Sequence, residues 1–162
     1  MPTLRAALSA LAGLTVPGIR HNHDLDALPT YLDRAGLPAL IVLPGDETAY
    51  AGGAPRRLFA ERGRAFEAIA FAGGPRTISY AITHLLLAAR ADEGLGLRDH
   101  LPALVTLVDA YFAALAADVT LGGALAEPAR VGVEVSVFTY GGASYHGCAL
   151  RHAWLIDMDG PA

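Results

Sequence analysis

The chain has 162 residues, 12 basic and 16 acidic side chains, and a net charge of -4. An apolar fraction of 53% with only 17% charged residues excludes intrinsic disorder, and the acidic balance argues against a surface that follows nucleic-acid phosphates. This length suits one domain, residues 1–162, and the apolar excess suggests either a rich core or further surface buried between subunits.

The first third of the chain predicts a helix and two short strands. Thr3 is placed to cap a helix that ends near Gly13, with Leu4, Ala7, Leu8 and Leu11 at helical spacing. This N-terminal run has the length of a signal sequence, but VPGIRHNHD follows it without a cleavage pattern, so we expect it in the mature protein. GIRHNHD predicts a short strand, and the run from Leu37 to Leu43 predicts another that stops at Pro44.

The middle of the chain predicts a loop and a hairpin. Residues Gly45 to Pro55 have turn chemistry and no periodicity, which indicates a long surface loop or arm. The segments Ala65 to Ala72 and Thr77 to Ala88 have strand-like composition and are separated by GGPR. We therefore expect these two segments to form a β-hairpin.

A long helix follows, and it is apolar on two sides. One face keeps a spacing of three and four residues over six turns: Leu97, Leu101, Leu104, Val105, Val108, Phe112, Leu115 and Val119. The other side is small and apolar rather than charged: Ala103, Leu107, Ala110, Ala114 and Ala117. The run is short for a bilayer and contains Pro102 and Asp109, so it predicts a helix that is buried or meets a neighbouring subunit, with no membrane partner.

The C-terminal segment gives the clearest strand pattern. Val131, Val133, Val135 and Val137 alternate with small or polar residues, the chain turns through YGGAS, and the return strand carries Cys148, Leu150, His152, Trp154 and Ile156 on one face. With the earlier elements, this order predicts an α+β fold in which one mostly antiparallel or mixed β-sheet with long hairpins packs against two helices. One apolar face per strand predicts two layers.

Two catalytic hypotheses would use the histidines and the only cysteine. A metal site would combine His21 and His23 with His146 and Cys148, because residues two apart share a strand face about 6.6 Å apart. Nothing in the sequence brings the two pairs together, and His152 lies about 13 Å along the strand from Cys148. A thiol nucleophile at Cys148 would use His146 as its base, but the apolar strand pattern favours a buried cysteine. We therefore expect no enzyme and no cofactor.

The chain resembles the tail terminator proteins of long-tailed bacteriophages. The resemblance is carried by LPALIVLP, RTISYAITHLLLA, the GLG turn, the long helix, and VGVEVSVFTYGGASYHGCALRHAWLIDM, over residues Leu4 to Met158. HNHD and GDETAYAGGAP have no counterpart in the family. The resemblance implies a non-catalytic virion protein at the head-tail junction, assembled in the host cytoplasm.

In that family the protein forms a ring, expected to be a hexamer, that caps the head-proximal end of the tail tube. The resemblance implies three partners: further copies of the chain, the tail tube protein and the head connector proteins. It also implies that DNA passes through the lumen without sequence-specific binding, and a slightly acidic protein suits such a channel. The alternatives are another neck protein, for head completion or head-tail adaptation, and the metal or thiol enzyme described above.

Candidate contact residues follow from position rather than chemistry. We expect the loop Asp46 to Arg57 and the turn Tyr140 to Tyr145 to touch neighbouring subunits or the tube, and we expect four arginines to donate to ion pairs between subunits. The full set is Asp46, Glu47, Tyr50, Arg56, Arg57, Arg62, Arg64, Tyr140 and Tyr145.

Overall fold

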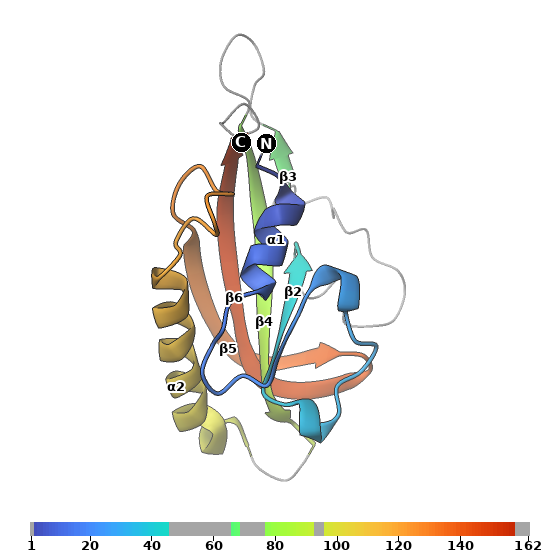
Figure 1. Cartoon of the computed structure of the whole chain (residues 1–162). Helices are drawn as coiled ribbons and strands as arrows, with labels where there is room; N and C mark the ends of the chain where they lie inside the picture. The colour runs from blue at the N-terminus through green and yellow to red at the C-terminus, as the bar shows by residue number, and fades with distance from the viewer. Residues whose placement is uncertain (1, 46–65, 69–76, 93–95, 158–162) are drawn as a thin grey trace.

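The computed structural model describes residues 2–45, 66–68, 77–92 and 96–157 (Figure 1). One sheet has the strand order β1-β2-β4-β6-β5, and β3 pairs with β4. The β1–β2 pair is parallel and all other pairs are antiparallel, which confirms the predicted α+β fold with a mixed sheet. The elements are α1 (Leu4–Ala12), β1 (His21–His23), the 3-10 turns η1 (Leu25–Ala27) and η2 (Arg34–Gly36), β2 (Ala39–Pro44), β3 (Phe66–Ala68), β4 (Thr77–Arg90), α2 (Leu97–Ala116), β5 (Arg130–Tyr140) and β6 (Ala143–Asp157).

Helix α1 has the limits that its sequence predicts. The hydroxyl of Thr3 accepts a hydrogen bond from the Ala6 N–H at 3.1 Å, and the helix ends at Gly13, whose N–H donates to the carbonyls of the last turn. Ala7, Leu8 and Leu11 are buried. The spacing of the apolar side chains therefore identified the correct buried face.

Strands β5 and β6 form the predicted C-terminal hairpin. The turn consists of Gly141 and Gly142 alone, both with positive φ, as a two-residue type I′ turn requires. Strand β6 therefore begins at Ala143, earlier than the sequence indicated. A side chain at Gly141 would overlap the backbone of Thr30, so glycine is needed there for space as well as for conformation.

The larger core lies between the sheet and both helices. Figure 1 shows α1 in front of the sheet and α2 beside β5. Leu8 and Leu11 of α1 and Leu104 and Leu115 of α2 pack in one cluster with inward side chains of β2, β4 and β6. The predicted Cys148, Leu150, Trp154 and Ile156 belong to this core, as does the buried His152.

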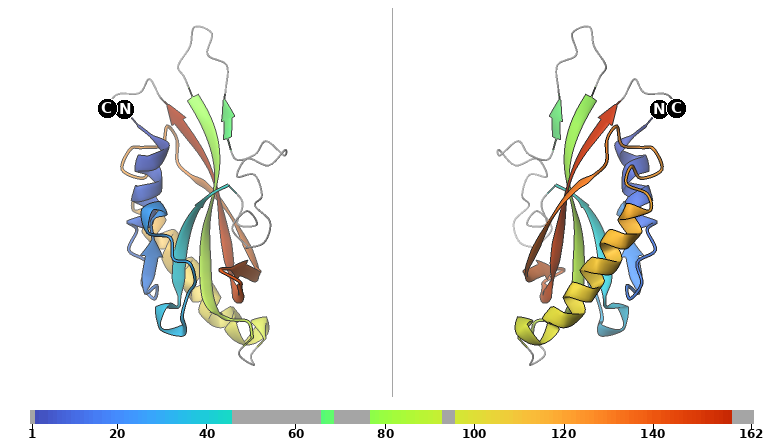
Figure 2. Two further views of the ribbon diagram at one scale, coloured as in Figure 1. Left: turned by 90° about the vertical axis from the view of Figure 1, so that its right-hand side faces the viewer. Right: turned by 90° about the vertical axis from the view of Figure 1, so that its left-hand side faces the viewer.

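The opposite face of the sheet is also buried, which the two-layer prediction missed. Leu32 and Leu37 from the connection before β2 pack against Ile41, and the turn end of the β5–β6 hairpin closes the same small core. Figure 2 shows this end of the hairpin on the side of β4 away from α1. The reason is visible in β2, whose residues Ala39–Leu43 are all buried: a continuous apolar run needs cover on both faces.

Helix α2 turns to the core side chains from both of its two apolar sides. Its buried side chains are Leu104, Leu107, Tyr111 and Leu115. Leu101, Val105 and Phe112, which share a predicted apolar face with Leu104 and Leu115, are exposed. The helix therefore is not enclosed within the domain, and part of its apolar surface faces outward.

Candidate functional site

A chain of polar side chains crosses the larger core. The Trp154 N–H donates to Nδ1 of His152 at 3.1 Å, and Nε2 of His152 lies 2.7 Å from the Tyr111 hydroxyl. That hydroxyl lies 2.9 Å from Nδ1 of His84, whose Nε2 lies 2.8 Å from the Asn22 side-chain oxygen. The Asn22 amide in turn donates to two backbone carbonyls at the end of α1, those of Leu11 and Leu14.

The donor and acceptor of every hydrogen bond in this series are determined by the two groups at its ends, Trp154 and Asn22. Trp154 can only donate, so Nδ1 of His152 accepts and its Nε2 carries the proton. The Tyr111 oxygen accepts this hydrogen bond and its own O–H donates to Nδ1 of His84, so the Nε2–H of His84 donates to the Asn22 side-chain oxygen. Both histidines are therefore neutral and fully bonded, and a second proton on either ring would have no acceptor.

Burial also favours the neutral form of both histidines. Desolvation lowers the pKa of His152 to about 4, and desolvation followed by the neighbouring His152 lowers the pKa of His84 well below its usual value. Desolvation raises the pKa of the Tyr111 hydroxyl. These groups connect α1, β1, β4, α2 and β6, and their arrangement is that of a structural network.

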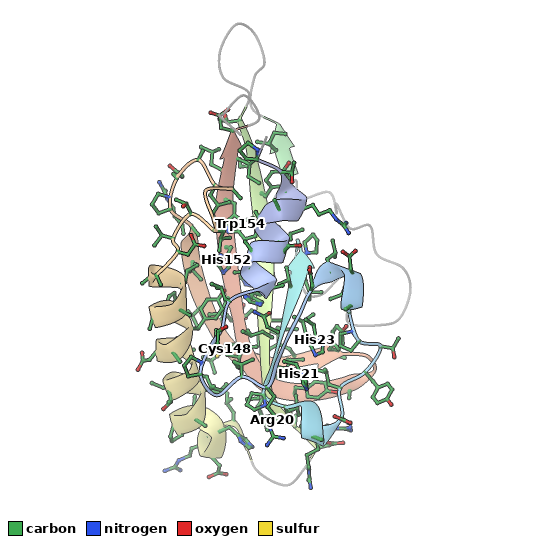
Figure 3. All side chains as sticks on the ribbon, in the orientation of Figure 1. Arg20, His21, His23, Cys148, His152 and Trp154 are labelled. Atoms are coloured by element: carbon green, nitrogen blue, oxygen red, sulfur yellow. The ribbon has the colours of Figure 1, made fainter. Side chains whose placement is uncertain are left out.

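The two halves of the proposed metal site lie apart, with His21 and His23 away from Cys148 (Figure 3). Asn22 faces the larger core, so its neighbours His21 and His23 point to the opposite face of the sheet. Strand β6, with His146 and Cys148, is three positions from β1, about 14 Å at a strand spacing of 4.8 Å. Burial raises the pKa of the Cys148 thiol to about 11, which disfavours the nucleophilic thiolate. Among the described residues, no three metal-ligating side chains gather at one point.

The feature that can serve a partner is an uncovered apolar surface, which we call the α2–β5 face. It consists of Leu101, Val105 and Phe112 on α2 and of Val133, Val135 and Val137 on β5, with exposed fractions between 36% and 58%. Isolated apolar side chains are common on protein surfaces, but six on adjoining elements indicate a contact surface.

Contacts at both ends of α2 show that these two rows adjoin. Near the start of the helix, the ring of His100 stacks on His146 at 5.1 Å, and His146 is the strand partner of Val137. Eleven residues further, Tyr111 bonds His152, which is the partner of Val131. Helix α2 therefore runs along β6, and the valines of β5 lie beside it on the same face of the sheet.

Strand β5 also ends the sheet. Its only described neighbour is β6, and its 11 residues leave a long row of backbone groups without a strand partner. Such an edge is a template for another strand unless charge, proline or a bulge blocks it. The register between β5 and β6 has no irregularity, and Glu134 is held by Arg151 of β6 at 2.6 Å.

Most of the predicted contact residues lie outside the described residues: Asp46, Glu47, Tyr50, Arg56, Arg57, Arg62 and Arg64. The other two, Tyr140 and Tyr145, are buried in the smaller core. The Tyr140 hydroxyl donates to the Pro29 carbonyl, and the Tyr145 hydroxyl donates to the Leu32 carbonyl at 3.1 Å. Their side chains hold the hairpin against the chain's own connection, and their contact with a neighbouring subunit stays a prediction.

The sequence contained the signal for the α2–β5 face but not for the histidine network. The alternating valines and the two-sided helix are visible in the sequence, whereas His84, Tyr111 and Asn22 stand on separate elements with no motif between them. By length and composition alone α2 would also qualify to cross a membrane, and only 22% of its most apolar stretch is buried. Comparison of the chain with protein-family models, curated proteins and solved structures gives no match.

Proposed function

We propose that this protein is a structural virion protein of a long-tailed bacteriophage. In this proposal it caps the head-proximal end of the tail tube as a ring, ends tube polymerisation and offers a docking face to the head connector. The observation that carries the proposal is the α2–β5 face, because a protein whose activity is assembly needs apolar surface beyond its own core. The resemblance described above directs that assembly role to the phage tail.

The histidine network supports an assembly role over catalysis. His84 and His152, the histidines with the most strongly lowered pKa, are buried and bonded on both ring nitrogens within the chain. Their perturbed titration therefore has a structural explanation and needs no substrate. The net charge of -4 is also compatible with a ring through which DNA slides, since a basic lumen would hold phosphates.

The experiment is electron microscopy of particles made without this protein. We expect tails of excessive or irregular length that are not joined to DNA-filled heads, and we expect the wild-type gene in trans to restore joined virions. Normal virions in its absence would refute the proposal. Tails of normal length beside unjoined filled heads would refute the terminator role and indicate the alternative, a head-completion or adaptor protein.

A second arm asks whether the α2–β5 face is the working surface. Complementation with Val135→Glu should fail, because a carboxylate would have to be buried at the contact. Complementation with Tyr31→Glu should succeed, since Tyr31 is exposed beside the Gly141 turn and does not belong to the α2–β5 face. Equal rescue by both variants would show that assembly does not use this face.

A further inference from the structure

We propose that the free protein pairs two copies through the edge of β5, so that the two α2–β5 faces adjoin and their valine rows contact each other. The pairing does not depend on the proposed ring. A two-fold pair has two equivalent sides, whereas a ring between tube and head has two different ones. The pair is therefore a form of the protein before assembly, and building a ring would require it to open.

The first argument is that the face is its own best complement. Among the described residues, every exposed large apolar side chain except Tyr31 belongs to this face or, as Val119, lies just beyond the end of α2. An apolar surface gains most from covering another apolar surface. Within the described part of the chain, a second copy offers that surface only through the same face, which implies a two-fold contact.

The second argument is the direction of the backbone groups. The Ser144 carbonyl accepts from the Ala91 N–H at 2.9 Å, on the side of β6 away from β5. Ser144 is opposite Thr139, so this pair is not hydrogen-bonded, and Thr139 directs its own backbone groups to the free edge. Because the direction alternates along a strand, the same is true of Val137, Val135 and Val133. The residues with exposed valine side chains are thus the ones that can pair with another strand.

The third argument is the register that the charges allow. A two-fold axis at Glu134 would set two carboxylates directly opposite each other, which is unfavourable. An axis at Val135 sets Val135 opposite its counterpart and Val133 opposite Val137, while Glu134 meets Ser136. The valine rows of both copies then form one surface, and the two α2 helices flank it on the same side of a continuous sheet.

Sedimentation velocity of the purified full chain tests the pairing. We expect a dimer at tens of micromolar, a monomer for Val135→Glu, and a dimer for the control Tyr31→Glu. Circular dichroism should show the same fold for all three proteins, because both substituted side chains are exposed. A monomeric wild-type protein, or a dimer that persists in Val135→Glu, would overturn the proposal.

Disulfide trapping tests the register. In Val135→Cys the two new cysteines would face each other with Cα atoms about 5.5 Å apart, within reach of a disulfide. In the matched variant Glu134→Cys they would lie diagonally, about 8 Å apart and too far. Cys148 is the strand partner of residue 135, so both variants are made with Cys148→Ala, which prevents a disulfide within one copy. We therefore expect oxidation to give a covalent dimer of Val135→Cys only.

Two outcomes would contradict the proposed strand register or the proposal that a second copy covers the face. A covalent dimer from Glu134→Cys but not from Val135→Cys would overturn the pairing described here. A monomer that co-sediments with phosphatidylglycerol vesicles would assign the face to a lipid surface instead. Neither result bears on tail length or head joining, so the pairing and the proposed virion role can fail separately.

Discussion

Removing the hydroxyl of Tyr111 should destabilise the protein far more than the loss of one oxygen suggests. Tyr111→Phe keeps the ring in the core but deletes the contacts of 2.9 Å to His84 and 2.7 Å to His152. One buried acceptor and one buried donor are then left without partners. At about 1–3 kcal/mol for each of the two unsatisfied groups, the expected loss is about 2–6 kcal/mol of the free energy of unfolding.

Urea denaturation followed by circular dichroism measures this loss as a lower midpoint with an unchanged m-value. The matched control is Tyr31→Phe, which removes the same atom from an exposed tyrosine and should change stability by less than about 0.5 kcal/mol. If Tyr111→Phe were as stable as the control, the hydrogen-bond chain would not be a connected structural unit, and the reasoning about the neutral histidines would be wrong.

Three further predictions concern buried residues of β6. Burial lowers the pKa of His152 from 6.5 to about 4, so its contribution to the free energy of unfolding is complete above pH 6.5 and is lost as the pH falls to about 4. At about 1.4 kcal/mol per tenfold change, this loss is about 3 kcal/mol. Urea denaturation across that pH range measures it. Gly147→Ala should lower the melting temperature markedly, because the added methyl group would overlap the Leu86 backbone. The control Gly132→Ala has open space around the added methyl group and should leave the melting temperature unchanged. Equal melting temperatures for the two variants would contradict the close strand contact at Gly147. The Cys148 thiol, with its pKa raised to about 11, should react with a disulfide reagent slowly in the native protein at pH 8 and rapidly in urea; fast native reaction would show that it is accessible.

The parts of the fold that the sequence predicted are those determined by local rules. The limits of α1 follow from Thr3 and Gly13, which satisfy the helix ends by themselves. The C-terminal hairpin follows from the alternation around Val135 and from the Gly141–Gly142 turn. Each of these signals lies within a few residues of the structure that it specifies.

The parts that the sequence did not predict depend on residues far apart in the chain. The smaller core joins the connection around Leu32 to the hairpin turn, and the Tyr145 hydroxyl bonds a carbonyl 113 residues away. The histidine network joins five elements in the same way. No local periodicity of the sequence predicts such contacts, because each residue of a pair is compatible with many other partners.

The network also explains why α2 leaves one apolar stripe uncovered. Tyr111 must place its hydroxyl between His84 and His152, which fixes the rotation of the helix about its axis. At 100° per residue, the buried stripe of Leu104, Tyr111 and their neighbours then lies roughly 90° from the stripe of Leu101, Val105 and Phe112. A rotation toward the second stripe would remove the Tyr111 hydroxyl from this position, and each buried imidazole would lose one of its two partners. The polar network in the core thus keeps the α2–β5 face on the outside, where another molecule can cover it.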